Sequence, residues 1–187
     1  MDDRFLAYKI LSKIERDKAY SNIAVDTVLN QNEVSSAPFV CALVYGVIER
    51  KITLDYYLSK LLTQPIKKLN PQVLTILRMG VYQIIFLDKI PLSAAVNESV
   101  KLAKRYGHQA SSGFVNGVLR NVGRSGDVQY PSGREYYEIF YSHPKWFCDM
   151  LFEQYGDEAK VIIESSDVDN AYNFMQGFGR GMDYINT

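Results

Sequence analysis

The spacing of apolar residues is the feature that most constrains how this chain can fold. Through the first 126 residues, apolar side chains recur at intervals of three and four positions. The first such stripe consists of Phe5, Leu6, Ile10, Leu11 and Ile14. That interval matches one face of an α-helix, whereas a strand would alternate with a period of two, and no stretch sustains that alternation. The sequence therefore predicts an all-α fold built from packed amphipathic helices.

Short polar residues and prolines divide this region into about seven predicted helices. Such side chains can accept a hydrogen bond from the unpaired N–H groups of a first helical turn. The expected helix openings, in chain order, are Asp2 or Asp3, Ser21, Ser36, Thr53, Asn70, Ser93 and Ser111. Gly107 is the expected stop of the sixth helix, and the seventh is expected to end near Arg120.

Charge divides the chain into two parts, although the net charge of the whole is zero. Residues 1–126 hold 17 Lys and Arg against 10 Asp and Glu, whereas residues 127–187 hold 4 against 11. A basic part of this size is typical of a protein that binds a polyanion, and evenly dispersed surface charge is the alternative. The pattern predicts a domain over 1–124, a linker over 125–134, a helical segment over 135–165 and an irregular tail over 166–187.

Six polar side chains interrupt apolar helical segments and need hydrogen-bond partners if they are buried. They are Arg78, Gln83, Asn97, Glu98, Asn116 and Arg120. Such residues can tie helices together by hydrogen bonds, and Glu98 can pair with one of the arginines. For Asn97, Glu98 and Asn116 we expect this structural role rather than contact with a ligand. Gly80 and Gly117 stand in the same segments, and we expect them to let helices approach closely.

No catalytic or metal-binding constellation is evident in the sequence. Cys41 and Cys148 stand among apolar residues, and with the two histidines they show no metal-ligand spacing. We interpret both cysteines as buried small hydrophobic residues. The start Met1-Asp2-Asp3 is acidic where a signal peptide would be basic, and no apolar run approaches the roughly 18 residues that span a bilayer, so we expect a cytoplasmic protein.

Three separated motifs carry a resemblance to a known family. They are residues 76–83 (ILRMGVYQ), 90–103 (IPLSAAVNESVKLA) and 113–120 (GFVNGVLR). In this order they resemble the NusB-like N-terminal domain of the Sun/Fmu (RsmB) family, the bacterial 16S rRNA cytosine-C5 methyltransferases. Residues 43–47 (LVYGV) are similar to the middle of that domain, and residues 142–146 (SHPKW) are similar to the segment that joins it to the methyltransferase domain.

The resemblance implies a NusB-like bundle of about seven helices followed by a short helical C-terminal segment. In the family, a Rossmann-like domain comes next, binds S-adenosylmethionine and uses a cysteine to attack the cytosine. These 187 residues contain no such domain, and from about Ser166 the sequence departs from the family. We therefore expect a truncated chain or a frameshifted gene product that binds no cofactor and has no activity alone.

We interpret the chain as the RNA-binding part of a 16S rRNA cytosine-C5 methyltransferase, with ribosomal RNA as its partner. The alternative is a free-standing NusB-like transcription antitermination factor that binds RNA and a protein partner. The segment from Ser142 to Gly156 favours the first hypothesis. A protein-interaction bundle without RNA affinity is the third.

Exposed cations are the candidate phosphate contacts in an RNA-binding domain. The candidates are Arg4, Lys9, Arg50, Lys51, Lys101, Lys104, Arg105, Arg120 and Arg124. Lys101, Lys104 and Arg105 stand at positions i, i+3 and i+4, so they can share one helical face. That cluster is the strongest sequence candidate for an RNA-binding surface.

Overall fold

The computed structural model describes residues 2–108, 110–126 and 128–165, and the chain divides into two compact units, residues 1–128 and 129–187. Every regular element in the described ranges is helical, which confirms the predicted all-α fold. Within the same ranges, no helix has both the length and the apolar character needed to cross a bilayer. The tail predicted over 166–187 lies outside the described residues.

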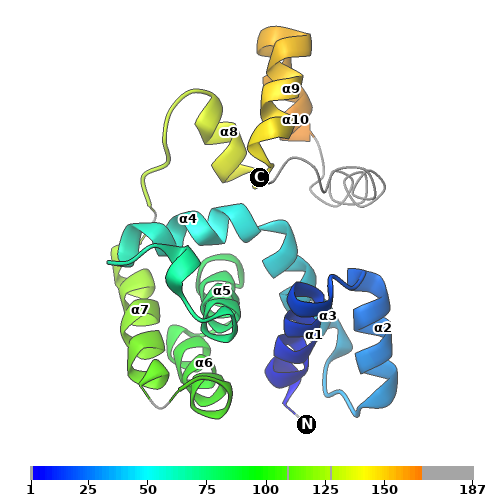
Figure 1. Ribbon diagram of the computed structural model, residues 1–187, viewed down its shortest axis with the longest axis vertical. Helices are drawn as coiled ribbons and strands as arrows, with labels where there is room; N and C mark the ends of the chain where they lie inside the picture. The colour runs from blue at the N-terminus through cyan, green and yellow to red at the C-terminus, as the bar shows by residue number, and fades with distance from the viewer. Residues whose placement is uncertain (1, 109, 127, 166–187) are drawn as a thin grey trace. The chain divides into compact units, whose positions relative to one another are not determined.

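The first unit is a helical bundle. Its elements are α1 (Asp3–Asp17), α2 (Ser21–Gln31), α3 (Ala37–Glu49), α4 (Lys51–Leu61), the 3-10 turn η1 (Ile66–Lys68), α5 (Pro71–Phe86), α6 (Leu92–Tyr106) and α7 (Ser111–Ser125). Figure 1 shows α1–α3 gathered on one side of this unit and α5–α7 on the other. Both α1 and α3 pack against α5, which joins the two groups into one core.

Three of the predicted helix openings are confirmed by side-chain caps. The Asp2 carboxylate accepts a hydrogen bond from the backbone N–H of Arg4 at 3.0 Å. Ser36 Oγ caps α3 at 3.3 Å, and Asn70 Oδ1 caps α5 at 2.9 Å. Each cap satisfies a donor that the helix itself leaves unpaired, which stabilises the helix by about 1 kcal/mol.

Helix α7 begins at Ser111 as predicted, whereas the predicted openings at Ser21 and Thr53 are wrong by one and two residues. Ser21 is the first residue inside α2, because the extended backbone of Tyr20 occupies the capping position without a side-chain hydrogen bond. Helix α4 begins at Lys51 rather than Thr53, because Arg50 ends α3 and starts α4 at once. Thr53 is instead a buried residue of α4, 1% exposed.

Helix α7 extends to Ser125, well beyond its predicted end near Arg120. Val122 is 1% exposed, so the added turn contributes to the core. A Cβ atom on Gly123 would lie 2.6 Å from Leu92, which shows how closely this turn approaches α6. Tertiary packing therefore keeps helical a stretch whose glycine and serine content indicates a linker.

The second unit consists of short helices around a small core of its own. They are α8 (Arg134–Phe140), α9 (Lys145–Tyr155), the 3-10 turn η2 (Gly156–Glu158) and α10 (Ala159–Ser165). Its buried core residues are Phe147, Cys148, Leu151, Phe152, Ala159 and Ile163. Gly156 ends α9 with a φ of 55°, a conformation that favours glycine.

The two cysteines differ in their surroundings. Cys148 is 2% exposed, and burial raises the pKa of its thiol to about 12, which confirms the interpretation of a buried hydrophobic residue. Cys41 in α3 is only partly buried, so the same interpretation is wrong for that residue.

Candidate nucleic-acid interface

Helix α1 meets the C-terminal end of α6 through stacked aromatic rings. The ring centroids of Phe5 and Tyr106 lie 5.6 Å apart, and the ring planes are at an angle of 10°. Tyr8 stacks on the same Tyr106 ring at 4.8 Å. Tyr8 is buried, whereas Phe5 and Tyr106 remain partly exposed, so the stack extends from the core to the surface.

Cations surround the exposed end of this stack. The guanidinium of Arg105 lies 4.9 Å from the centre of the Phe5 ring and 5.4 Å from that of Tyr106. The ammonium of Lys9 lies 5.6 Å from the Phe5 ring on α1. Such cation–π contacts hold a positive group near a ring while leaving its other side open to solvent.

The α6 cluster predicted from sequence is exposed as expected. Lys101, Lys104 and Arg105 all lie at the surface of α6. Lys101 pairs with Glu98 at 2.6 Å, and the charges of Asp2 and Arg4 near the start of α1 act on it in opposite directions. We call Arg4, Lys9, Lys101, Lys104 and Arg105 the α1–α6 basic surface.

Arg4 is the most constrained member of the α1–α6 basic surface. Its Nε donates a hydrogen bond to Oε1 of Gln83 at 2.6 Å, and its guanidinium lies 5.0 Å from the ring of Phe39. Gln83 is 1% exposed and donates its own Nε2 to the carbonyl oxygen of Met79. Arg4 therefore joins α1 to α3 and α5 as well as contributing positive charge.

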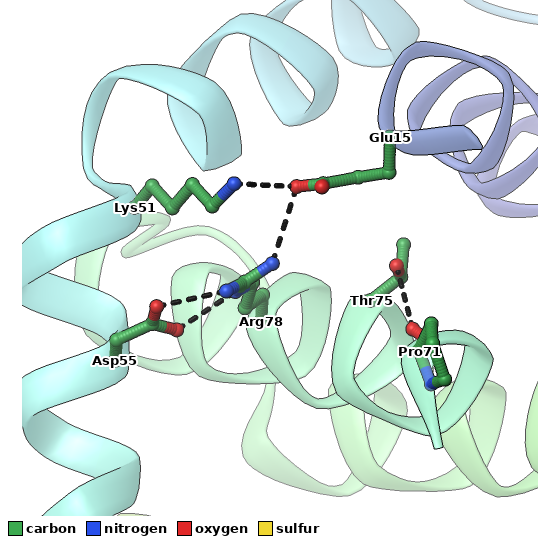
Figure 2. Close-up of polar contacts among 6 residues, drawn as sticks. All are labelled: Glu15, Lys51, Asp55, Pro71, Thr75 and Arg78. Atoms are coloured by element: carbon green, nitrogen blue, oxygen red, sulfur yellow. Dashed lines mark hydrogen bonds and ion pairs between the residues drawn. The ribbon is translucent and has the colours of Figure 1, made fainter. Parts of the chain in front are cut away.

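Two further candidates contact partners on other helices. The Arg50 guanidinium lies 5.4 Å from the ring of Phe86 in α5. The Lys51 ammonium pairs with the Glu15 carboxylate of α1 at 2.7 Å. The same Glu15 oxygen accepts a hydrogen bond from Arg78 Nη1 at 3.2 Å, as Figure 2 shows. Lys51 thus belongs to an ionic network that connects α1, α4 and α5.

Arg78 is the centre of that network. Its side chain is 9% exposed, and its Nε and Nη2 donate two parallel hydrogen bonds to Asp55 at 2.7 and 2.8 Å (Figure 2). Paired hydrogen bonds to a carboxylate are among the stronger polar contacts in proteins. For Arg78 and Gln83, the expectation that they tie helices together is confirmed.

In the described part of the chain, the other four polar residues form no such connection between helices, so the expectation is wrong for Asn97, Glu98 and Asn116. Asn97 is exposed on α6. Glu98 pairs with Lys101 of its own helix rather than with an arginine, because the i, i+3 spacing brings the two side chains together. Asn116 accepts a hydrogen bond from Arg120 Nε at 3.0 Å, again within one helix. Asn97 and Arg120 are exposed, whereas Glu98 and Asn116 are partly buried.

Arg120 and Arg124 extend along the exposed side of α7. None of the ring, ion-pair or hydrogen-bond contacts in the described residues connects them to the α1–α6 basic surface. Gly117 lies on this same helix, and a Cβ atom there would meet nothing within 4 Å. The expectation that Gly117 permits close helix packing is therefore wrong, whereas Gly80 does pack closely, with Leu119 2.5 Å from its Cβ position.

Glu15 gives the ionic network a dependence on pH. Burial alone would raise the pKa of Glu15, but the hydrogen bond from Lys51 and the charges of Lys51 and Arg78 outweigh it and lower that pKa below its ordinary value of 4.5. The group therefore stabilises the fold above about pH 4.5 and loses this effect as the pH falls through its folded pKa. We expect the difference in melting temperature between wild type and Glu15→Gln to narrow from pH 6 towards pH 3. A constant difference over that range would contradict this linkage.

Comparisons with known proteins agree with this architecture. The NusB family model matches residues 1–124. The probable ribosomal RNA small subunit methyltransferase B of Bacillus subtilis (strain 168) is 39% identical over 167 residues, which are 86% of this chain and 37% of that protein. The transcription antitermination protein NusB of Ruminiclostridium cellulolyticum is 34% identical over 132 residues, which are 70% of this chain and 89% of that protein.

A solved structure of the antitermination factors NusB and NusE in complex with dsRNA contains a chain of the same fold. It matches with a TM-score of 0.60 and 23% sequence identity, covering 66% of this chain and 95% of that one. The helical bundle thus defines a protein of the NusB fold. With its family match over residues 1–124, the chain belongs to the NusB family. It spans little more than a third of the length of the methyltransferase relative.

Proposed function

We propose that this chain is the ribosomal RNA-recognition part of a 16S rRNA cytosine-C5 methyltransferase and contacts RNA through the α1–α6 basic surface. The extent of the match carries this proposal. The methyltransferase relative aligns with 86% of the chain, which is more than the first unit of residues 1–128 and so extends into the second. The antitermination relative aligns over 132 residues, about the length of the first unit alone.

The chemistry of the α1–α6 basic surface supports RNA as the ligand. Its exposed cations can replace the counterions of a phosphate backbone, and that exchange contributes much of the affinity of such complexes. Arg105 holds its guanidinium against aromatic rings, an arrangement that leaves N–H donors available to phosphate. The relative solved as a NusB complex contains dsRNA, which supports RNA binding by this family of bundles.

A free-standing antitermination factor is the second candidate. It is favoured by the match to an antitermination protein, which is 34% identical and is covered over 89% of its length. Titrating the full chain with fragments of 16S rRNA separates the two. A fragment that binds at least about tenfold more tightly than unrelated RNA of equal length supports ribosomal RNA recognition. Equal affinity for all RNAs contradicts it.

The triple substitution Lys101→Ala, Lys104→Ala and Arg105→Ala should weaken RNA binding without unfolding the domain. Losing up to three phosphate contacts should lower the slope of log affinity against log salt by about 2. The free energy of unfolding should stay close to that of wild type, because all three side chains are exposed. Salt titrations of RNA binding and thermal melts measure the two effects.

The matched control removes three exposed cations from elsewhere on the first unit. Arg16, Lys67 and Lys68 are exposed and lie outside the α1–α6 basic surface. Their joint replacement by Ala removes the same charge and should leave the salt slope close to that of wild type. If both triple variants lose affinity equally, the RNA contacts are not on the α1–α6 basic surface.

A further inference from the structure

The second unit contains a cavity of about 620 Å³ that none of the RNA contacts proposed above uses. It lies between the start of α8, the end of α9 and the η2–α10 turn. Tyr136, Tyr137 and Phe152 supply aromatic rings to its wall. Its volume falls within the roughly 300–1,000 Å³ typical of small-molecule sites.

The basic side chains of the second unit gather at this cavity. Residues 129–165 hold three basic side chains against seven acidic ones. Two of the three basic residues, Arg134 and Lys160, line the cavity, whereas only one of the seven acidic residues, Asp157, does so. An acidic unit that concentrates its few cations at one hollow offers a local site for an anion, while its remaining surface repels an extended polyanion.

Both cations are positioned to accept an anionic ligand. The Arg134 guanidinium lies 4.9 Å from the centre of the Phe152 ring, and within residues 128–165 it forms no ion pair with a carboxylate. Lys160 pairs with Asp157 at 2.8 Å, but the Asp157 side chain is 92% exposed. Such an exposed ion pair is weak, so Lys160 can exchange this partner for a phosphate at little cost.

We propose that this cavity binds one nucleotide, with its base against the aromatic rings and its phosphate on Arg134 and Lys160. Rings and cations in a single hollow match the two parts of a nucleotide, since bases stack on aromatic side chains and arginine pairs with phosphate. The acidic surroundings limit the ligand to one such group rather than a length of backbone. The nucleotide is either an unpaired residue of an RNA or a free nucleotide, and the site is independent of the α1–α6 basic surface.

An NMR titration of the ¹⁵N-labelled full chain tests the proposal. The probes are cytidine 5′-monophosphate, cytidine and ribose 5-phosphate. Cytidine 5′-monophosphate should cause saturable shifts of the Gly133 and Gly156 amides, which both line the cavity. Cytidine, which lacks the phosphate, and ribose 5-phosphate, which lacks the base, should each bind at least about fivefold more weakly. Equal binding of all three, or no saturable shift at these amides, overturns the proposal.

Charge substitutions locate the phosphate. The double variant Arg134→Ala and Lys160→Ala should weaken binding at least about fivefold while keeping the dispersed amide spectrum of the folded chain. Lys145→Ala is the matched control, because Lys145 forms a comparable exposed pair with Asp149 at 2.9 Å and does not line the cavity. It should bind as wild type does, and an equal loss in this control overturns the proposal.

A short cytidine oligoribonucleotide distinguishes the two sources of ligand. The shifts of the cavity amides give the affinity of each ligand. If the oligonucleotide binds at least about tenfold more tightly than the mononucleotide, the site receives an unpaired residue of RNA. If the mononucleotide binds as tightly as the oligonucleotide, the ligand is a free nucleotide. Either result supports the cavity as a nucleotide site. Neither depends on the salt titrations that test the α1–α6 basic surface.

Discussion

Replacing Arg78 with Met should lower the free energy of unfolding by about 3 kcal/mol, the lower end of the range for breaking a buried ion pair. The Arg78 side chain is 9% exposed, and without it the Asp55 and Glu15 carboxylates lose their shared cationic partner. These carboxylates are 29% and 37% exposed, so water compensates part of the loss. Chemical denaturation at neutral pH measures the change.

Two further variants show whether the ionic network is the cause. Arg78→Lys keeps the charge but cannot make the paired hydrogen bonds to Asp55 while reaching Glu15. Its loss in free energy of unfolding should therefore be smaller than that of Arg78→Met. Arg16→Met removes an exposed arginine that pairs with Asp17, and it should leave the free energy of unfolding close to that of wild type. A loss at Arg78 no larger than at Arg16 would contradict a stabilising role for the network.

The fold follows closely from the sequence because helices carry their pattern locally. The apolar stripe of α1 and the caps at Ser36 and Asn70 involve residues only a few positions apart, and the structure has them as predicted. Helix α8 lacks such a signal, since Gly133 precedes it with a φ of 72° and no side chain caps it. The last turn of α7 depends on Leu92, a contact that local spacing does not contain.

The candidate surface follows from the sequence only in part, for the same reason. The spacing of Lys101, Lys104 and Arg105 predicts their shared exposed side of α6. It does not reveal that Arg105 lies over Phe5 on α1, or that Arg4 bonds to Gln83, 79 positions away. Phe5 belongs to the apolar stripe that predicts the core, so its contribution to a surface cluster has no sequence signal.

Replacing Gly80 with Leu should lower the free energy of unfolding by about 3 kcal/mol. A Cβ atom at this position would lie 2.5 Å from a Leu119 methyl carbon of α7 and 3.0 Å from Ser99 Oγ of α6. Leu119 is 0% exposed and Ser99 1%, so neither side chain has open space into which it can move. The larger residue must therefore separate α5 from α6 and α7, which opens the core of the first unit.

Gly117→Leu is the matched control for helix propensity. Its backbone is helical like that of Gly80, but a Cβ atom there meets nothing within 4 Å. Since Leu favours a helix over Gly, this variant should gain up to about 0.8 kcal/mol of stability. The two variants make the same chemical change. If the free energy of unfolding falls in one and rises in the other, the difference is due to the packing of α5 against α6 and α7. Equal changes at both positions would mean that the bundle accommodates a side chain at Gly80, and that close approach there does not limit its stability.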